Sequence, residues 1–73
     1  MNQYLYPWHD RLGNNEIGVI NAKNYTDSKD RLAKRLLDEY DKLDDTLEFD
    51  ELIDQLGEIY GVYIGDIYDI NEF

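Results

Sequence analysis

The chain has 73 residues, no cysteine and a formal net charge of −10. This length suffices for one small domain but not for a large buried cleft. Without cysteine the chain has neither a disulfide framework nor a thiolate metal site. A strongly negative protein is also a poor direct ligand for nucleic acids and anionic lipids, which are polyanions themselves. We therefore expect a single acidic domain over residues 1–73 that is stabilised by packing.

The charge is divided unevenly along the chain. Residues 1–37 hold six bases and four acids, a net charge of +2, whereas residues 38–73 hold one base and thirteen acids, a net charge of −12. No apolar run approaches the roughly 18 residues of a membrane span, and residues 1–11 lack the features of a signal peptide. These observations predict a soluble, intracellular protein without a membrane partner.

The first 22 residues have the pattern of a β-hairpin. In residues 2–12, NQYLYPWHDRL, the missing N–H of Pro7 predicts an edge strand or an extended arm. Residues 13–15, GNN, are turn formers, and residues 16–22, EIGVINA, have the composition of a short strand. Gly18 either weakens this second strand or marks a bulge.

A first helix is predicted from about Asp27 to Leu43, with Thr26 or Asp27 as its N-cap. Its outer face changes from basic to acidic, and pairs four residues apart, Lys34 with Asp38 and Arg35 with Glu39, are expected to interact. The apolar stripe of this helix recurs at helical spacing and consists of Leu32, Ala33, Leu36, Leu37, Tyr40 and Leu43.

A second helix is predicted from the cap Thr46 to about Tyr60, where Gly61 ends it. Its buried stripe is Phe49, Leu52, Ile53, Leu56, Ile59 and Tyr60. Residues 62–64 then predict a strand, and residues 67–70 predict either a further strand or a docked terminal segment. The expected fold is α+β in the order ββααβ, with a small antiparallel sheet packed on two neighbouring helices.

The second helix carries an outward ridge of Glu48, Glu51, Gln55 and Glu58, with Asp54 beside it. Like charges at this spacing repel by roughly 0.2–0.5 kcal/mol a pair, so a role other than stability is indicated. A purely solubilising face is the alternative. The candidate partner-binding residues are Asp38, Asp41, Asp44, Asp45, Glu48, Asp50, Glu51, Asp54, Glu58, Tyr63, Asp66, Tyr68 and Asp69.

In size, charge and tyrosine content, residues 38–73 resemble the small acidic DNA-mimic inhibitors of phages and mobile elements, including anti-CRISPR and anti-restriction proteins. The resemblance is one of class and includes no defining motif. It implies that rows of carboxylates imitate phosphates and block the basic surface of a nucleic-acid-binding protein, with tyrosines stacking on guanidinium groups. The basic segment from Lys29 to Arg35 departs from a uniformly acidic mimic.

Other functions find less support in the sequence. The acids Asp41, Asp44, Asp45 and Glu48 lack the alternate spacing and central glycine of a calcium loop, although a weak cation site stays open. His9 beside Asp10 has no partner set for nucleophilic catalysis. We therefore expect no enzyme activity and no cofactor. The alternative is a small adaptor or self-associating subunit, possible as a homodimer, that binds through exposed tyrosines and apolar residues.

Overall fold

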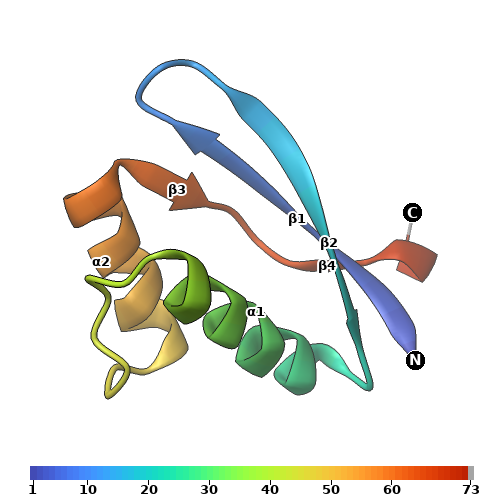
Figure 1. Cartoon of the computed structure of the whole chain (residues 1–73). Helices are drawn as coiled ribbons and strands as arrows, with labels where there is room; N and C mark the ends of the chain where they lie inside the picture. The colour runs from blue at the N-terminus through green and yellow to red at the C-terminus, as the bar shows by residue number, and fades with distance from the viewer. Residues whose placement is uncertain (73) are drawn as a thin grey trace.

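A computed structural model, which describes residues 1–72, confirms the α+β fold and the order ββααβ (Figure 1). The strands are β1 (Asn2–Asp10), β2 (Asn15–Ala22), β3 (Val62–Ile64) and the two-residue β4 (Tyr68–Asp69). The helices are α1 (Tyr25–Glu39), α2 (Phe49–Tyr60) and a final 3-10 turn, η1 (Ile70–Glu72). The C-terminal segment is therefore a short strand followed by a helical turn. None of the helices formed by residues 1–72 has the length and hydrophobicity needed to cross a bilayer.

Strand β1 lies at the centre of the sheet, so the prediction of an edge strand or extended arm is wrong. It pairs antiparallel with β2 on one side and with both β3 and β4 on the other. Pro7 is accommodated because its carbonyl accepts from the Gly65 amide at 2.8 Å, so its nitrogen faces the gap between β3 and β4. The missing N–H of Pro7 thus faces the break between β3 and β4, where the hydrogen-bond ladder along this side of β1 is interrupted.

Gly18 marks no bulge, because the register runs without a break from Asn2 opposite Ala22 to His9 opposite Asn15. The glycine is needed for a different reason: the phenol ring of Tyr6, its cross-strand partner, lies where a β-carbon would be. The Tyr6 hydroxyl then accepts from Arg35 Nη1 at 3.1 Å, and the same nitrogen donates to the Val19 carbonyl at 2.9 Å. Gly18 therefore allows α1 to be tied to β2.

Helix α1 starts earlier and ends earlier than predicted. Asn24 is the N-cap, and its side chain accepts from the Asp27 amide at 2.9 Å, whereas neither Thr26 nor Asp27 is the cap. The Asp27 carboxylate accepts from the Lys23 amide just before the helix, also at 2.9 Å. Leu43 lies beyond the helix, yet it is buried in the core as predicted.

Helix α2 begins at Phe49, and Thr46 is not its cap. Gly61 ends the helix as predicted, in the left-handed conformation with φ 68°. The predicted stripe is correct except at its end: Leu52 and Leu56 are buried, but Ile59 is 42% exposed and does not belong to the buried face.

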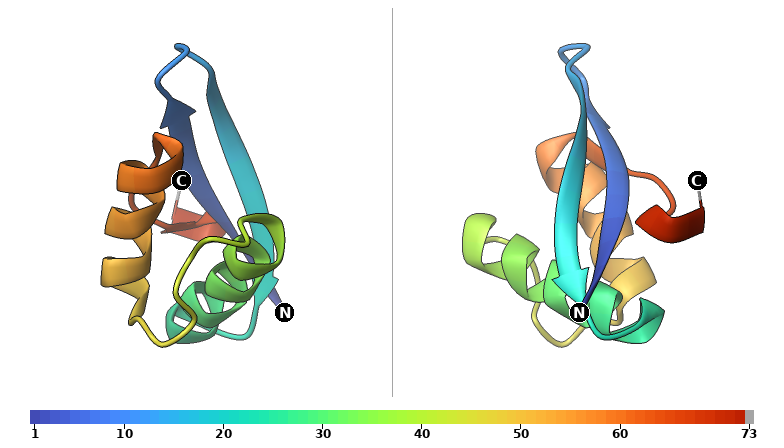
Figure 2. Two further views of the ribbon diagram at one scale, coloured as in Figure 1. Left: turned by 60° about the vertical axis from the view of Figure 1, so that its left-hand side comes forward. Right: turned by 90° about the vertical axis from the view of Figure 1, so that its right-hand side faces the viewer.

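Helices α1 and α2 both pack on the same face of the sheet. On β1 the side chains of Tyr4, Tyr6 and Trp8 alternate toward the helices, where they meet Leu32 and Leu56 in the core. The hairpin of β1 and β2 extends past the helices, and α2 and η1 lie on opposite sides of it (Figure 2). The acidic helix is therefore packed on one side of the sheet only.

Candidate acidic interface

The carboxylates of α2 and of its N-cap Glu48 point into solvent, as the spacing predicted. Glu48, Asp50, Glu51, Asp54 and Glu58 are all exposed. A shallow hollow of about 300 Å³ is lined by Leu47, Glu51, Asp54, Gln55 and Glu58, which include three members of the predicted ridge and the neighbouring Asp54. Two of the acids, Asp50 and Glu51, lie in the first turn of α2, where the positive end of the helix dipole offsets part of their repulsion.

Hydrogen bonds hold the acidic loop between α1 and α2 against α2. The Asp44 amide donates to Gln55 Oε1 at 2.7 Å. The Tyr60 hydroxyl accepts from the Lys42 amide at 3.1 Å and donates to Asp41 Oδ1 at 3.3 Å. The loop carboxylates of Asp41 and Asp44, both exposed, are thereby placed beside the acids of the helix.

Asp44 is the most constrained of the loop acids. Its Oδ1 accepts from the Thr46 hydroxyl at 2.7 Å and from the Thr46 amide at 2.9 Å. The hydroxyl bond first, and then the amide bond, lower the pKa of Asp44 below its ordinary value of 3.8. Thr46, predicted as the cap of α2, instead fixes this carboxylate in its charged form. Its neighbour Asp45 is exposed.

Among residues 1–72, the protein's own bases form no ion pair with these acids. Over residues 1–72, the sole ion pair joins Arg31 Nε to Asp27 Oδ2 at 2.8 Å, outside the acidic half. The predicted pairs of Lys34 with Asp38 and of Arg35 with Glu39 do not form. Ion pairs between oppositely charged side chains on an exposed helix contribute little, and Arg35 instead bonds to the sheet.

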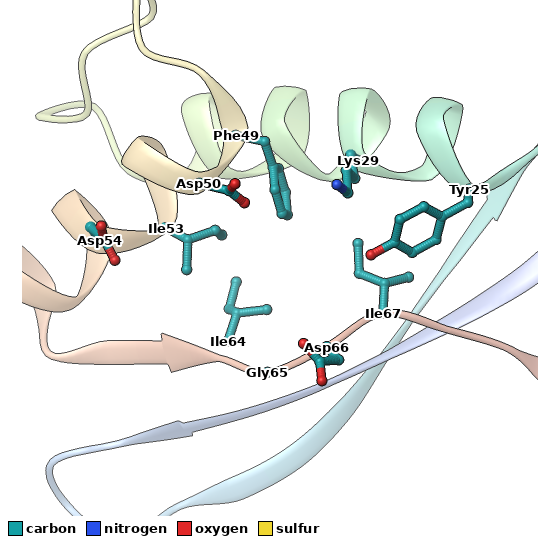
Figure 3. A pocket seen from close by; sticks show the side chains of 10 residues that line it. All are labelled: Tyr25, Lys29, Phe49, Asp50, Ile53, Asp54, Ile64, Gly65, Asp66 and Ile67. Carbon is teal, nitrogen blue, oxygen red and sulfur yellow. The ribbon is translucent and has the colours of Figure 1, made fainter.

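A groove of about 340 Å³ opens between α1, α2 and the segment that joins β3 to β4 (Figure 3). Asp50 and Asp54 contribute to it from α2 and Asp66 from the β3–β4 segment, above an apolar lining that includes Ile53 and Ile64. The structure thus brings Asp66, distant in sequence, to the same groove as two acids of α2.

One cation, Lys29, lies in this groove. Its ammonium is 4.9 Å from the ring centre of Tyr25 and 5.8 Å from that of Phe49, so it contacts aromatic faces (Figure 3). Tyr25 and Lys29 are not among the residues predicted for the site. Their spacing of four residues on one helix face was the available signal.

The remaining predicted residues are spread more widely. Asp38 is exposed near the end of α1. Asp69 is half-buried on β4, opposite Tyr4, and accepts from the Asn71 amide at 2.9 Å. The acids of α2, its loop and Asp66 therefore form the coherent part of the surface, which we call the acidic surface: Asp41, Asp44, Asp45, Glu48, Asp50, Glu51, Asp54, Glu58 and Asp66.

The two predicted tyrosines lie on strands, away from the α2 ridge. Tyr63 is opposite His9, and their rings stack with centres 5.2 Å apart and planes at 25°. Its ring also lies against Gly57 of α2, so Tyr63 borders the acidic surface. Tyr68 of β4 lies opposite Leu5 of β1.

Among residues 1–72 there is no group of three or more His, Asp or Glu side chains arranged to hold a metal ion.

Comparisons with protein-family models, with curated proteins and with solved structures found no match. The function is therefore argued from the surface of this chain.

Proposed function

We propose that the protein is an acidic inhibitor that occupies the basic, nucleic-acid-binding surface of another protein. The observation that carries this proposal is the exposure of the acidic surface, whose acids form no ion pair with a base among the described residues 1–72. A solubilising role needs a moderate charge of mixed sign, whereas here the acids are concentrated on one helix and the loop bonded to it.

The physical basis is the similarity between a row of carboxylates and a row of phosphates. Carboxylates three and four residues apart on a helix are separated by about 5–6 Å at their β-carbons, comparable to phosphate spacing along a strand. A channel lined with Lys and Arg attracts either row through the same long-range field. The resemblance in size and composition to phage and mobile-element inhibitors supports an anti-defence protein, of the anti-CRISPR or anti-restriction kind, acting in the bacterial cytoplasm.

The test is capture of a partner from a bacterial lysate on the immobilised protein, followed by elution with duplex DNA. A mimic releases its partner to DNA because both ligands compete for one surface. The variant Glu48→Gln, Glu51→Gln, Asp54→Asn, Glu58→Gln should lose at least tenfold in affinity for that partner.

A control with the same net charge makes this test specific to the position of the acids. Both the variant above and the control Glu16→Gln, Asp30→Asn, Glu39→Gln, Glu72→Gln change −10 by four, to −6, and all eight positions are exposed. The control should bind nearly as the natural protein does. Equal losses in both variants, or a partner that DNA does not displace, would refute mimicry.

A second candidate is an adaptor that binds through exposed apolar residues, with the acids only keeping it soluble. The exposed apolar residues of β2 favour it, because Ile17 and Val19 are 67% and 46% exposed. Salt separates the two functions: binding by the acidic surface weakens steeply with ionic strength, while apolar binding changes little.

A further inference from the structure

The groove between α1, α2 and the β3–β4 segment combines apolar side chains with carboxylates on two sides (Figure 3). Ile53 and Ile64 point toward one another inside it. Asp50 and Asp54 lie on the α2 side, and Asp66 lies on the side of the β3–β4 segment. An apolar groove edged by carboxylates fits a long side chain that has an aliphatic stem and a cationic head.

The charges of the groove favour a further cation. Its lining contains three carboxylates and one ammonium, that of Lys29, so its formal charge is −2. Lys29 forms no ion pair with these acids in the part of the chain that the structure describes, residues 1–72. Its ammonium contacts the rings of Tyr25 and Phe49 instead. One additional cation would therefore leave the groove still negative, at −1.

The acids of the groove are held in place before any ligand arrives. Asp66 lies between two anchored residues: the Gly65 amide donates to the Pro7 carbonyl at 2.8 Å, and Ile67 is buried in the core. Asp54 lies within α2, whose packed face includes Leu52 and Leu56. A site with a fixed backbone loses less conformational entropy on binding.

We propose that this groove receives an arginine side chain of the partner protein. A guanidinium is planar, so it stacks on an aromatic ring and donates to carboxylates on two sides, whereas an ammonium is a more strongly hydrated point charge. Phe49 supplies the ring, and Asp54 and Asp66 supply the carboxylates. That the arginine belongs to a nucleic-acid-binding partner rests on the proposed function. The affinity of the groove for arginine does not.

Other occupants suit the groove less well. The described residues 1–72 include no group of His, Asp or Glu side chains arranged to hold a metal ion. A second copy of the chain is opposed by the net charge of −10 on each molecule. A wholly apolar side chain would leave the carboxylates without a partner.

The test is an NMR titration of the whole chain with the blocked tripeptide acetyl-Gly-Arg-Gly-amide. Saturable shifts should appear at the amides of the groove, among them Phe49, Ile53, Gly65 and Ile67. The same peptide with citrulline, a neutral isostere of arginine, should bind about tenfold more weakly, and the lysine peptide should lie between the two.

Two pairs of variants localise the binding. Asp66→Asn should raise the dissociation constant of the arginine peptide about threefold, because it removes one exposed carboxylate partner. Its control is Asp38→Asn, exposed and outside the groove, which makes the same change of net charge. Lys29→Gln should lower the constant, since it removes the cation that competes for the Phe49 ring. Lys34→Gln, exposed on the same helix, is its control. Circular dichroism confirms that all four variants are folded.

Equal affinities for the arginine and citrulline peptides, or equal effects of Asp66→Asn and Asp38→Asn, would overturn the proposal. Displacement of the captured partner by DNA tests the inhibitor function separately. A partner that DNA displaces, with a groove that does not distinguish arginine from citrulline, would refute the arginine site alone. An arginine-selective groove, with a partner that DNA does not displace, would support the site and refute mimicry.

Discussion

The two sides of the sheet differ in the side chains that they expose. On one side, α2 buries Leu52 and Leu56 and presents carboxylates to solvent. On the other, Ile17 and Val19 of β2 are 67% and 46% exposed. The comparison teaches that the exposed acids and the exposed apolar residues of this protein are concentrated on different elements.

The largest effect should come from the core that both sides share. Leu56 is fully buried, and Leu56→Ala should lower the free energy of unfolding by about 3 kcal/mol through lost burial and a cavity. Ile59→Ala, three residues further on the same helix but 42% exposed, should change it by about 0.5 kcal/mol or less. Urea denaturation measures both, and similar values would contradict the assignment of the buried stripe.

A smaller effect is expected where the sheet meets α1. Gly18→Val should destabilise by about 2 kcal/mol, because the new side chain displaces the Tyr6 ring that lies over Gly18. Tyr6→Phe should cost about 1 kcal/mol, since it removes the acceptor of one Arg35 bond but keeps the ring. Val19→Ala, on the opposite face, is the control. A Gly18→Val protein as stable as the control would show that the ring has room to move.

The acidic side should respond in the other direction. Glu58→Gln should raise the free energy of unfolding by about 0.5 kcal/mol, because Glu58 is four residues from Asp54 and close to the negative end of α2, with no base in the last turn. The gain should shrink in high salt. A loss of stability would mean that Glu58 makes a favourable contact within the domain.

The smallest effect concerns pH. Hydrogen bonds lower the pKa of Asp44, as they do for Asp10 and Asp27, so their contribution is present above pH 3.8 and is lost as pH falls through the lowered values. Asp44→Asn should therefore make the loss of stability in acid shallower. Repulsion among the other acids affects both proteins alike, so it cancels when the pH dependence of their unfolding free energies is compared. Identical acid unfolding curves would contradict the role given to Thr46.

Local patterns in the sequence were enough to predict the two helices, the hairpin and the outward acids. The spacing of Leu32, Leu36, Leu52 and Leu56 fixed which helix faces are buried, and Gly61 fixed where α2 ends. The outward direction of the α2 acids could then be predicted, because they occupy the helix positions that the apolar stripe leaves. Periodicity within a segment carries this information without knowledge of its neighbours.

The errors arose where a neighbouring segment decides the outcome. Pro7 predicted an edge strand, but the break between β3 and β4 supplies the gap that a central proline needs. Gly18 is explained by the Tyr6 ring on another strand. Ile17 and Val19 alternate with Gly18 and Ile20 in a strand that is apolar on both faces, a pattern that does not tell which face the helices cover.

The central claim is that the acidic surface substitutes for a polyanion. Its most direct test is the affinity for the captured partner, measured by calorimetry over a series of salt concentrations for the natural chain and for the four-acid α2 variant. The account predicts a steep loss of affinity with salt for the natural chain and a clearly smaller slope for the variant. An affinity that hardly changes with salt, or equal slopes for the two proteins, would contradict it.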